Sequence, residues 1–173
     1  MLYPGSFDPI HRGHVDVVEQ AVELFGHVVV AVMYNFAKPS GMFDVDDRVE
    51  LARQALAHLP GVEVSAHTGL AVDAATTEHV DFIVKGLRSG GDFEIEQQMA
   101  HTNHAVTGIR TVYVPCRPDL GFVSSRFVRE IAQYGGDVSR LVPPPVADAL
   151  RRHLGGGRAG AAPAGERQDG ASR

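Results

Sequence analysis

A ten-residue block near the N-terminus, Gly5 to His14, combines residue types that suit phosphate binding. Gly5 lets the backbone turn sharply and approach a ligand closely, and Ser6 offers a hydroxyl group. His11 and His14 are three residues apart, so near the start of a helix their imidazoles share one face. Free N–H groups at a helix N-terminus attract anions, and the block therefore predicts a polyphosphate site. A strand-to-helix turn with surface histidines is the competing interpretation, and it accounts less well for the whole block.

Basic residues recur at two later places, each expected just after a strand. Lys38 follows the apolar run 28–34, and Lys85 and Arg88 follow the short run 82–84. Ligands of parallel sheets bind beyond the carboxyl ends of the strands, so these cations are expected to face anionic groups. A solvated loop lysine is the alternative interpretation of Lys38. The guanidinium of Arg88 suits a forked contact with phosphate, whereas Lys85 acts as a point charge. The second set of cations indicates a second phosphate-bearing substrate.

Apolar runs alternate with helical patterns along the chain, which predicts an α/β fold with a doubly wound, five-stranded parallel sheet and C-terminal helices. Strands are expected over residues 1–3, 28–34, 62–66, 82–84 and 111–114. Helices are expected over residues 14–25, 44–58, 70–79, 92–105 and 146–154, with another from Ser124 to Gly135. Residues 1–154 are predicted to form one domain. Residues 155–173, rich in Gly and Ala, are predicted to be a disordered tail.

Composition narrows the classes of function. The chain has 173 residues with 44% hydrophobic residues and a formal net charge of −5. The acidic balance argues against bulk binding to nucleic acid, which needs a basic face. No apolar run approaches the roughly 20 residues that span a bilayer, so no membrane association is expected. With a single cysteine, Cys116, and no pattern typical of a signal peptide, the expected location is cytoplasmic.

The spacing of the remaining histidines does not predict a metal-binding site. His101 and His104 could form a pair of ligands, but no third ligand stands at a convincing spacing. Four further histidines are expected at the surface near the ends of elements: His27, His58, His67 and His79.

The block from Gly5 to His14 resembles the signature of the nucleotidyltransferase superfamily, which carries a His-x-Gly-His or Thr-x-Gly-His element at this place. Other motifs narrow the resemblance to the phosphopantetheine adenylyltransferase family over roughly residues 2–154: Ala37-Lys38-Pro39, Lys85-Gly86-Leu87-Arg88, Asp92-Phe93-Glu94-Ile95-Glu96, Phe122-Val123-Ser124-Ser125 and Gly136-Asp137-Val138. The resemblance implies a Rossmann-like nucleotidyltransferase fold. It also implies transfer of the adenylyl group of ATP to 4′-phosphopantetheine, giving dephospho-coenzyme A and pyrophosphate.

Site residues follow from the same resemblance. It implies His14, Lys38 and Ser6 as the catalytic residues. For ATP it implies Ser6, Phe7, His14, Gly86, Leu87, Arg88, Glu96, Leu120, Gly121, Phe122, Val123, Ser124, Ser125 and Arg126. For phosphopantetheine it implies Ser6, Lys38, Ala71, Lys85, Met99 and Asn103. It further implies Mg²⁺ bound with ATP, a homohexamer and feedback inhibition by coenzyme A.

Three residues depart from the family pattern. His11 stands where threonine is most frequent, Arg126 replaces a third small hydroxyl residue, and Lys85 stands where arginine is usual. A different nucleotidyltransferase, acting on nicotinamide mononucleotide or glycerol phosphate, is one rival interpretation. A non-catalytic nucleotide-binding module is another, although it would not need cations at Lys38 and Lys85.

Overall fold

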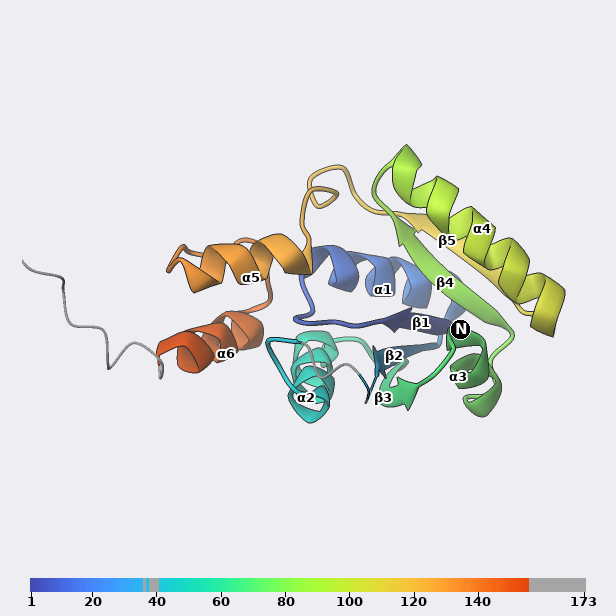
Figure 1. Ribbon diagram of the computed structural model, residues 1–173, viewed down its shortest axis with the longest axis horizontal. Helices are drawn as coiled ribbons and strands as arrows, with labels where there is room; N and C mark the ends of the chain where they lie inside the picture. The colour runs from blue at the N-terminus through green and yellow to red at the C-terminus, as the bar shows by residue number, and fades with distance from the viewer. Residues whose placement is uncertain (36, 38–40, 156–173) are drawn as a thin grey trace, which may run out of the picture.

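The computed structural model describes residues 1–35, 37 and 41–155, and it forms an α/β fold built on one parallel sheet (Figure 1). The strands are β1 (Leu2–Gly5), β2 (Val28–Tyr34), β3 (Val62–Thr68), β4 (Phe82–Leu87) and β5 (Arg110–Pro115). The helices are α1 (Arg12–Phe25), α2 (Val45–Leu56), α3 (Ala71–Thr77), α4 (Gly90–Thr107), α5 (Ser125–Gln133) and α6 (Pro144–Gly155). The predicted five-stranded parallel sheet is confirmed.

The strand order β3-β2-β1-β4-β5 places the topological switch point of the sheet between β1 and β4. β1 pairs with β2 along its whole length, from Leu2 to Gly5. Its recorded pairing with β4 is confined to Leu2 against Ile83. The carboxyl ends of β1 and β4 therefore diverge, as Figure 1 shows. Such a switch point is where open α/β sheets bind their ligands.

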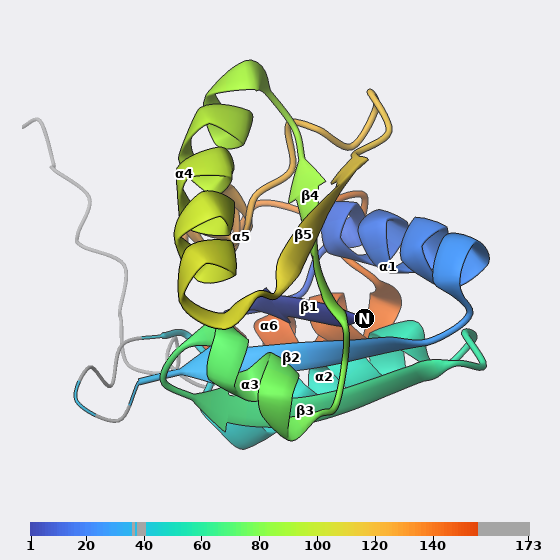
Figure 2. The same cartoon turned by 90° about the vertical axis from the view of Figure 1, so that its right-hand side faces the viewer.

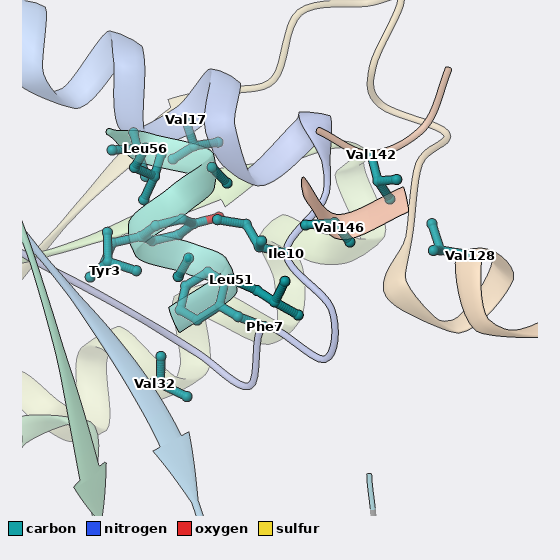
Figure 3. Close-up of a cluster of buried hydrophobic side chains, with 14 of the residues drawn as sticks. Tyr3, Phe7, Ile10, Val17, Val32, Leu51, Leu56, Val128, Val142 and Val146 are labelled. Atoms are coloured by element: carbon teal, nitrogen blue, oxygen red, sulfur yellow. The ribbon is translucent and has the colours of Figure 1, made fainter. Parts of the chain in front are cut away.

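Alternating side chains of the strands enter two separate cores. Tyr3, Val30 and Val32 belong to the core that α1, α2, α5 and α6 cover, part of which Figure 3 shows. Val29 and Ala31 belong to a smaller core with residues of α3. The valine-rich β2 is buried on both faces, as its sequence predicts. In Figure 2, α3 and α4 lie on the opposite side of the sheet from α1.

Most elements begin or end a few residues away from their predicted bounds, and the differences at β4 and at the last helix affect the interpretation. β4 does not stop at Val84, because its pairing with β5 continues to Leu87 against Pro115. Lys85, Gly86 and Leu87 thus lie within the strand, and the expectation that they follow it was wrong. The last helix begins at Pro144 rather than at residue 146. Proline is tolerated there because the first turn of a helix has no intrahelical partner for its missing N–H.

The C-terminal helices close the end of the domain where the turn between β1 and α1 lies. α6 packs on α2 and α5 packs on α6, and Val128, Val142 and Val146 extend the main core between them. Lys38 and residues 156–173 lie outside the described residues. Within the described ranges, no helix combines the length and apolarity needed to cross a membrane.

Candidate active site

A cavity of about 270 Å³ opens at the switch point of the sheet. Residues from β1, α1, β4, α4 and the N-terminus of α5 line it. Eight of the lining residues are among those predicted from the sequence: Phe7, His14, Lys85, Gly86, Arg88, Glu96, Ser124 and Ser125. Side chains separated by more than 100 positions in the chain therefore meet at one place.

The cavity also contains residues that the sequence analysis did not assign to it. Tyr3 and Pro4 reach it from β1, and Cys116 reaches it from the end of β5. Burial raises the pKa of the Cys116 thiol, so the thiol lines the wall in its neutral form. Their positions at strand ends were the available signal, because the carboxyl ends of neighbouring parallel strands share one edge of the sheet.

His11 and His14 form a reciprocal pair at the start of α1. The backbone N–H of His14 donates to Nδ1 of His11 at 3.3 Å, and the backbone N–H of His11 donates to Nδ1 of His14 at 3.2 Å. The rings are stacked with centroids 3.6 Å apart. Since Nδ1 accepts in both rings, we assign the ring proton of each neutral imidazole to Nε2. The pair therefore offers two oriented N–H donors.

Both imidazoles are held in the neutral form. Burial, with a smaller contribution from the positive charge of Arg88, lowers the pKa of His11 to about 3. Burial is also the main cause that holds the pKa of His14 well below its usual value, with smaller contributions from His11 and Arg88. At neutral pH these residues are hydrogen-bond donors, and neither is positioned to act as a cation.

The side chain of Phe7 packs against the histidine pair. Its side chain is 1% exposed, and its ring lies edge-on to that of His14 with centroids 5.0 Å apart. Phe7 has φ of 43°, a backbone conformation that bulky residues seldom adopt. A Cβ atom at Gly5 would lie 2.9 Å from Phe7 Cζ, so the ring requires glycine there. The turn is built around this ring.

The cations of the cavity are paired with carboxylates. Lys85 Nζ lies 3.2 Å from Glu96 Oε1. Arg88 donates from Nε and Nη2 to the two carboxylate oxygens of Asp92, at 3.0 and 3.1 Å. The hydrogen bond from Arg88 lowers the pKa of Asp92, and the pKa of Arg88 is raised by the same contact. A phosphate that binds here would compete with Asp92 and Glu96 for their partners.

The N-terminus of α5 faces the same cavity. Ser124 caps the helix by accepting from the backbone N–H of Phe127 at 3.3 Å. The hydroxyl of Ser125 donates to the carbonyl oxygen of Pro9 at 2.9 Å, which joins α5 to the β1–α1 turn. Ser124 thus serves as the N-cap of α5.

Other predicted site residues lie outside the lining of the cavity. Ser6 is exposed on the turn, and Val123 is buried in the main core. Leu87 lies at the end of β4, and Arg126 lies in the first turn of α5. The connection between β5 and α5 contains Leu120, Gly121 and Phe122. The predicted pantetheine residues Ala71, Met99 and Asn103 lie on α3 and α4 and do not line the cavity. Lys38 falls outside the described residues.

The chain is similar to known proteins over nearly all of its described length. The model of the cytidylyltransferase-like family matches residues 2–131. A phosphopantetheine adenylyltransferase from Streptomyces coelicolor is 44% identical over 151 residues, covering 87% of this chain and 94% of the relative. This chain belongs to the phosphopantetheine adenylyltransferase family. The resemblance seen in the sequence motifs is confirmed.

A solved structure shares the fold of this phosphopantetheine adenylyltransferase family member. It is a Vibrio parahaemolyticus protein described as a nicotinate-nucleotide adenylyltransferase, with a TM-score of 0.64 and 19% identity. The match covers 88% of this chain and 92% of the other chain. At this level of identity the likeness shows the common nucleotidyltransferase-like fold alone, so the choice of acceptor depends on the closer relationship.

Proposed function

We propose that this protein transfers the adenylyl group of ATP to 4′-phosphopantetheine, giving dephospho-coenzyme A and pyrophosphate in coenzyme A biosynthesis. The observation that carries the chemistry is the meeting of a neutral histidine pair, two cations and a helix N-terminus in one cavity. Membership of the phosphopantetheine adenylyltransferase family selects the acceptor.

The acceptor phosphate needs no general base. The second pKa of a phosphomonoester is about 6, so at neutral pH the group is mostly dianionic and already nucleophilic. Of the side chains lining the cavity, Glu96 is the carboxylate, and Lys85 holds it in an ion pair. The protein's work is to place the two substrates in line and to stabilise negative charge at the α-phosphate.

His14 is the residue we assign to the α-phosphate. Its Nε2–H is fixed by the hydrogen bond at Nδ1 and by the stacked ring of His11, so it needs little reorganisation as charge develops. Ser6, on the exposed part of the turn, and Lys38, beyond the described residues, are proposed to hold the acceptor phosphate. Arg88, with the first turn of α5, is proposed to hold the triphosphate.

Magnesium is proposed to enter with ATP. The donors that line the cavity are mainly nitrogen and hydroxyl groups, with Glu96 as the carboxylate. That set fits an ion held largely by phosphate oxygens and water, the usual binding mode of Mg²⁺ with nucleotides. When bound, the ion neutralises part of the charge of the phosphates.

The reaction is tested by measuring pyrophosphate release from ATP with one acceptor at a time. Release is expected with 4′-phosphopantetheine, and little is expected with nicotinamide mononucleotide or glycerol phosphate. Efficient release with either of the other acceptors would reject the assigned substrate. ATP binding without release for any acceptor would instead favour a nucleotide-binding module.

Three further properties form part of the proposal. Large apolar side chains on α4 are exposed, including Ile95 at 68% and Val106 at 75%, which supports burial against other copies in a homohexamer. Coenzyme A shares most of its structure with the proposed product, so feedback inhibition by competition at the same cavity is expected. The proposed location is the cytoplasm.

A further inference from the structure

We propose that Asp16 on α1 is a positioning residue that sets the segment 117–126, which leads from β5 into α5, at the correct distance from His14. The inference rests on the proposed function, which places His14 and the first turn of α5, at the end of this segment, against ATP. None of the roles assigned to the site so far involves Asp16.

Asp16 is a carboxylate buried at 1% exposure on the inner face of α1. Its Oδ2 accepts a hydrogen bond from the backbone N–H of Arg117 at 2.9 Å. Arg117 Nε lies 3.1 Å from Oδ1 of the same carboxylate. One side chain therefore accepts a hydrogen bond from the main chain of Arg117 and forms an ion pair with its guanidinium, although Oδ1 itself accepts no hydrogen bond among the described residues.

Gln20, one turn further along α1, extends this contact. Its Nε2 donates to Asp16 Oδ2 and to the carbonyl oxygen of Pro115, both at 3.1 Å. Between these contacts, the backbone N–H of Cys116 donates to the carbonyl oxygen of Leu87 at 2.8 Å. Three consecutive residues at the end of β5 are thus held against α1 and β4.

From this anchor the segment continues through two hydrogen-bonded turns. The backbone N–H of Leu120 donates to the carbonyl of Arg117 at 2.9 Å, and that of Val123 donates to Leu120 at 3.1 Å. The segment then reaches α5, where Ser125 is bound to Pro9. Asp16 holds the beginning of the segment, and the β1–α1 turn holds its end.

Asp16 affects catalysis by setting the distance between His14 and the segment 117–126. Asp16 follows His14 by two residues on the same helix, so a shift of Arg117 relative to α1 changes the spacing between the catalytic imidazole and this segment. Displacements of about 1 Å are enough to reduce turnover substantially. A buried carboxylate is also costly unless it is paired, so its contacts with Arg117 and Gln20 are strongly favoured.

The test uses the full chain and the variants Asp16→Asn and Gln20→Leu. Asp16→Asn removes the charge that attracts Arg117. Gln20→Leu removes the hydrogen bond to the carbonyl oxygen of Pro115 and keeps the carboxylate of Asp16. We expect the KM for ATP, and the Kd for Mg-ATP measured by calorimetry without acceptor, to rise about tenfold in Asp16→Asn. A smaller rise is expected in Gln20→Leu. The KM for 4′-phosphopantetheine should change less than about twofold.

Glu19→Gln is the matched control, because Glu19 neighbours Asp16 on α1 and lies 3.9 Å from Arg117 Nη1 without binding the main chain of the segment. Its kinetic constants should equal those of the wild type. A lowered Tm in the two test variants with unchanged ATP constants would mean a structural role alone and would overturn the proposal. Equal rises in KM for both substrates would also overturn it. If Asp16→Asn does not fold, Gln20→Leu decides by the same criteria.

Failure of this inference can be distinguished from failure of the proposed function. Absence of adenylyl transfer in the wild-type protein would reject the function. The Kd for Mg-ATP would still report whether Asp16 positions the segment 117–126, since that measurement needs no acceptor.

Discussion

At the scale of single residues, the site depends on two histidines that cannot easily become charged. Each imidazole accepts a backbone hydrogen bond at Nδ1; His11 is buried and His14 is partly buried. A neutral, oriented donor suits a reaction in which negative charge develops on phosphate oxygens. His11, although atypical of the family, completes this arrangement by capping α1 and stacking on His14.

Replacing His14 by alanine should reduce kcat about 10²–10³-fold, because one preorganised donor to the transition state is lost. The fold should persist, and circular dichroism should match the wild type. His27→Ala serves as a control, since His27 is half exposed and pairs with Glu63 away from the cavity. Turnover close to the wild-type value in His14→Ala would remove His14 from the mechanism.

The neutral histidines also predict how stability depends on pH. Their folded-state pKa values lie below the unfolded value of about 6.5, so below that pH the unfolded chain binds protons that the folded chain excludes. Stability should be complete above about pH 6.5 and should fall as the pH drops from there toward the folded pKa values. Each histidine contributes a slope of up to about 1.4 kcal/mol per pH unit.

In His11→Thr, one histidine fewer takes up a proton on unfolding, so the pH dependence of the free energy of unfolding should become shallower by up to about 1.4 kcal/mol per pH unit. Chemical denaturation between pH 7 and 5 measures this difference. An unchanged slope would show that His11 titrates normally in the folded protein. His58→Thr is a useful control, because His58 is exposed and bound to Glu19.

At the scale of elements, a polar cluster joins β3 to the end of α3. Glu78 Oε1 accepts from the hydroxyl of Ser65 at 2.7 Å and lies 2.6 Å from His67 Nε2. The side chain of His67 is 13% exposed, so the expectation that it is a surface residue was wrong. Burial arises because Ser65 and His67 alternate onto the face that α3 covers, which the local sequence does not reveal.

Glu78→Gln should lower Tm by roughly 2–4 °C at pH 7, equivalent to losing about one hydrogen bond. The hydrogen bond from Ser65 is the main cause that lowers the pKa of Glu78; His67 lowers it as well, and burial opposes them. Its contribution is therefore present above the unfolded pKa and is lost as pH falls through the lower folded pKa. The difference in Tm from the wild type should shrink under acid conditions, whereas Glu63→Gln on the exposed face of β3 should have little effect at any pH.

At the scale of the whole molecule, the least covered of the described helices is α4. It has no buried residue, although it is 18 residues long and carries several large apolar side chains. An uncovered helix of this composition favours self-association. The position of α4 beside β4 and β5 is shown in Figure 2.

Ile95→Glu should therefore convert the proposed hexamer into smaller species in sedimentation velocity experiments. A charge placed in an apolar contact is strongly unfavourable unless it is paired. Leu24→Glu, at an equally exposed position on α1, provides the comparison. A monomeric wild-type protein would contradict the proposed assembly outright.

Local signals in the sequence determined much of this protein. The valine run of β2, the N-caps at Asp44 and Ser124, and the shared face of His11 and His14 were all predictable. Each depends on neighbours within a few positions, where periodicity and capping preferences operate. The alternation of apolar runs and helical patterns predicted the sheet, and the resemblance of several motifs indicated the phosphopantetheine adenylyltransferase family.

Tertiary structure alone decided which side chains meet. Pairing with β5 extended β4 through Lys85, and the partner of Lys85 turned out to be Glu96 on the following helix. The contact between Asp16 and Arg117 spans 101 positions, and no local pattern signals it. Burial, pKa shifts and the shape of the cavity all arise from such distant contacts. The sequence thus determined the chemical groups and their elements, whereas packing decided their partners and charge states.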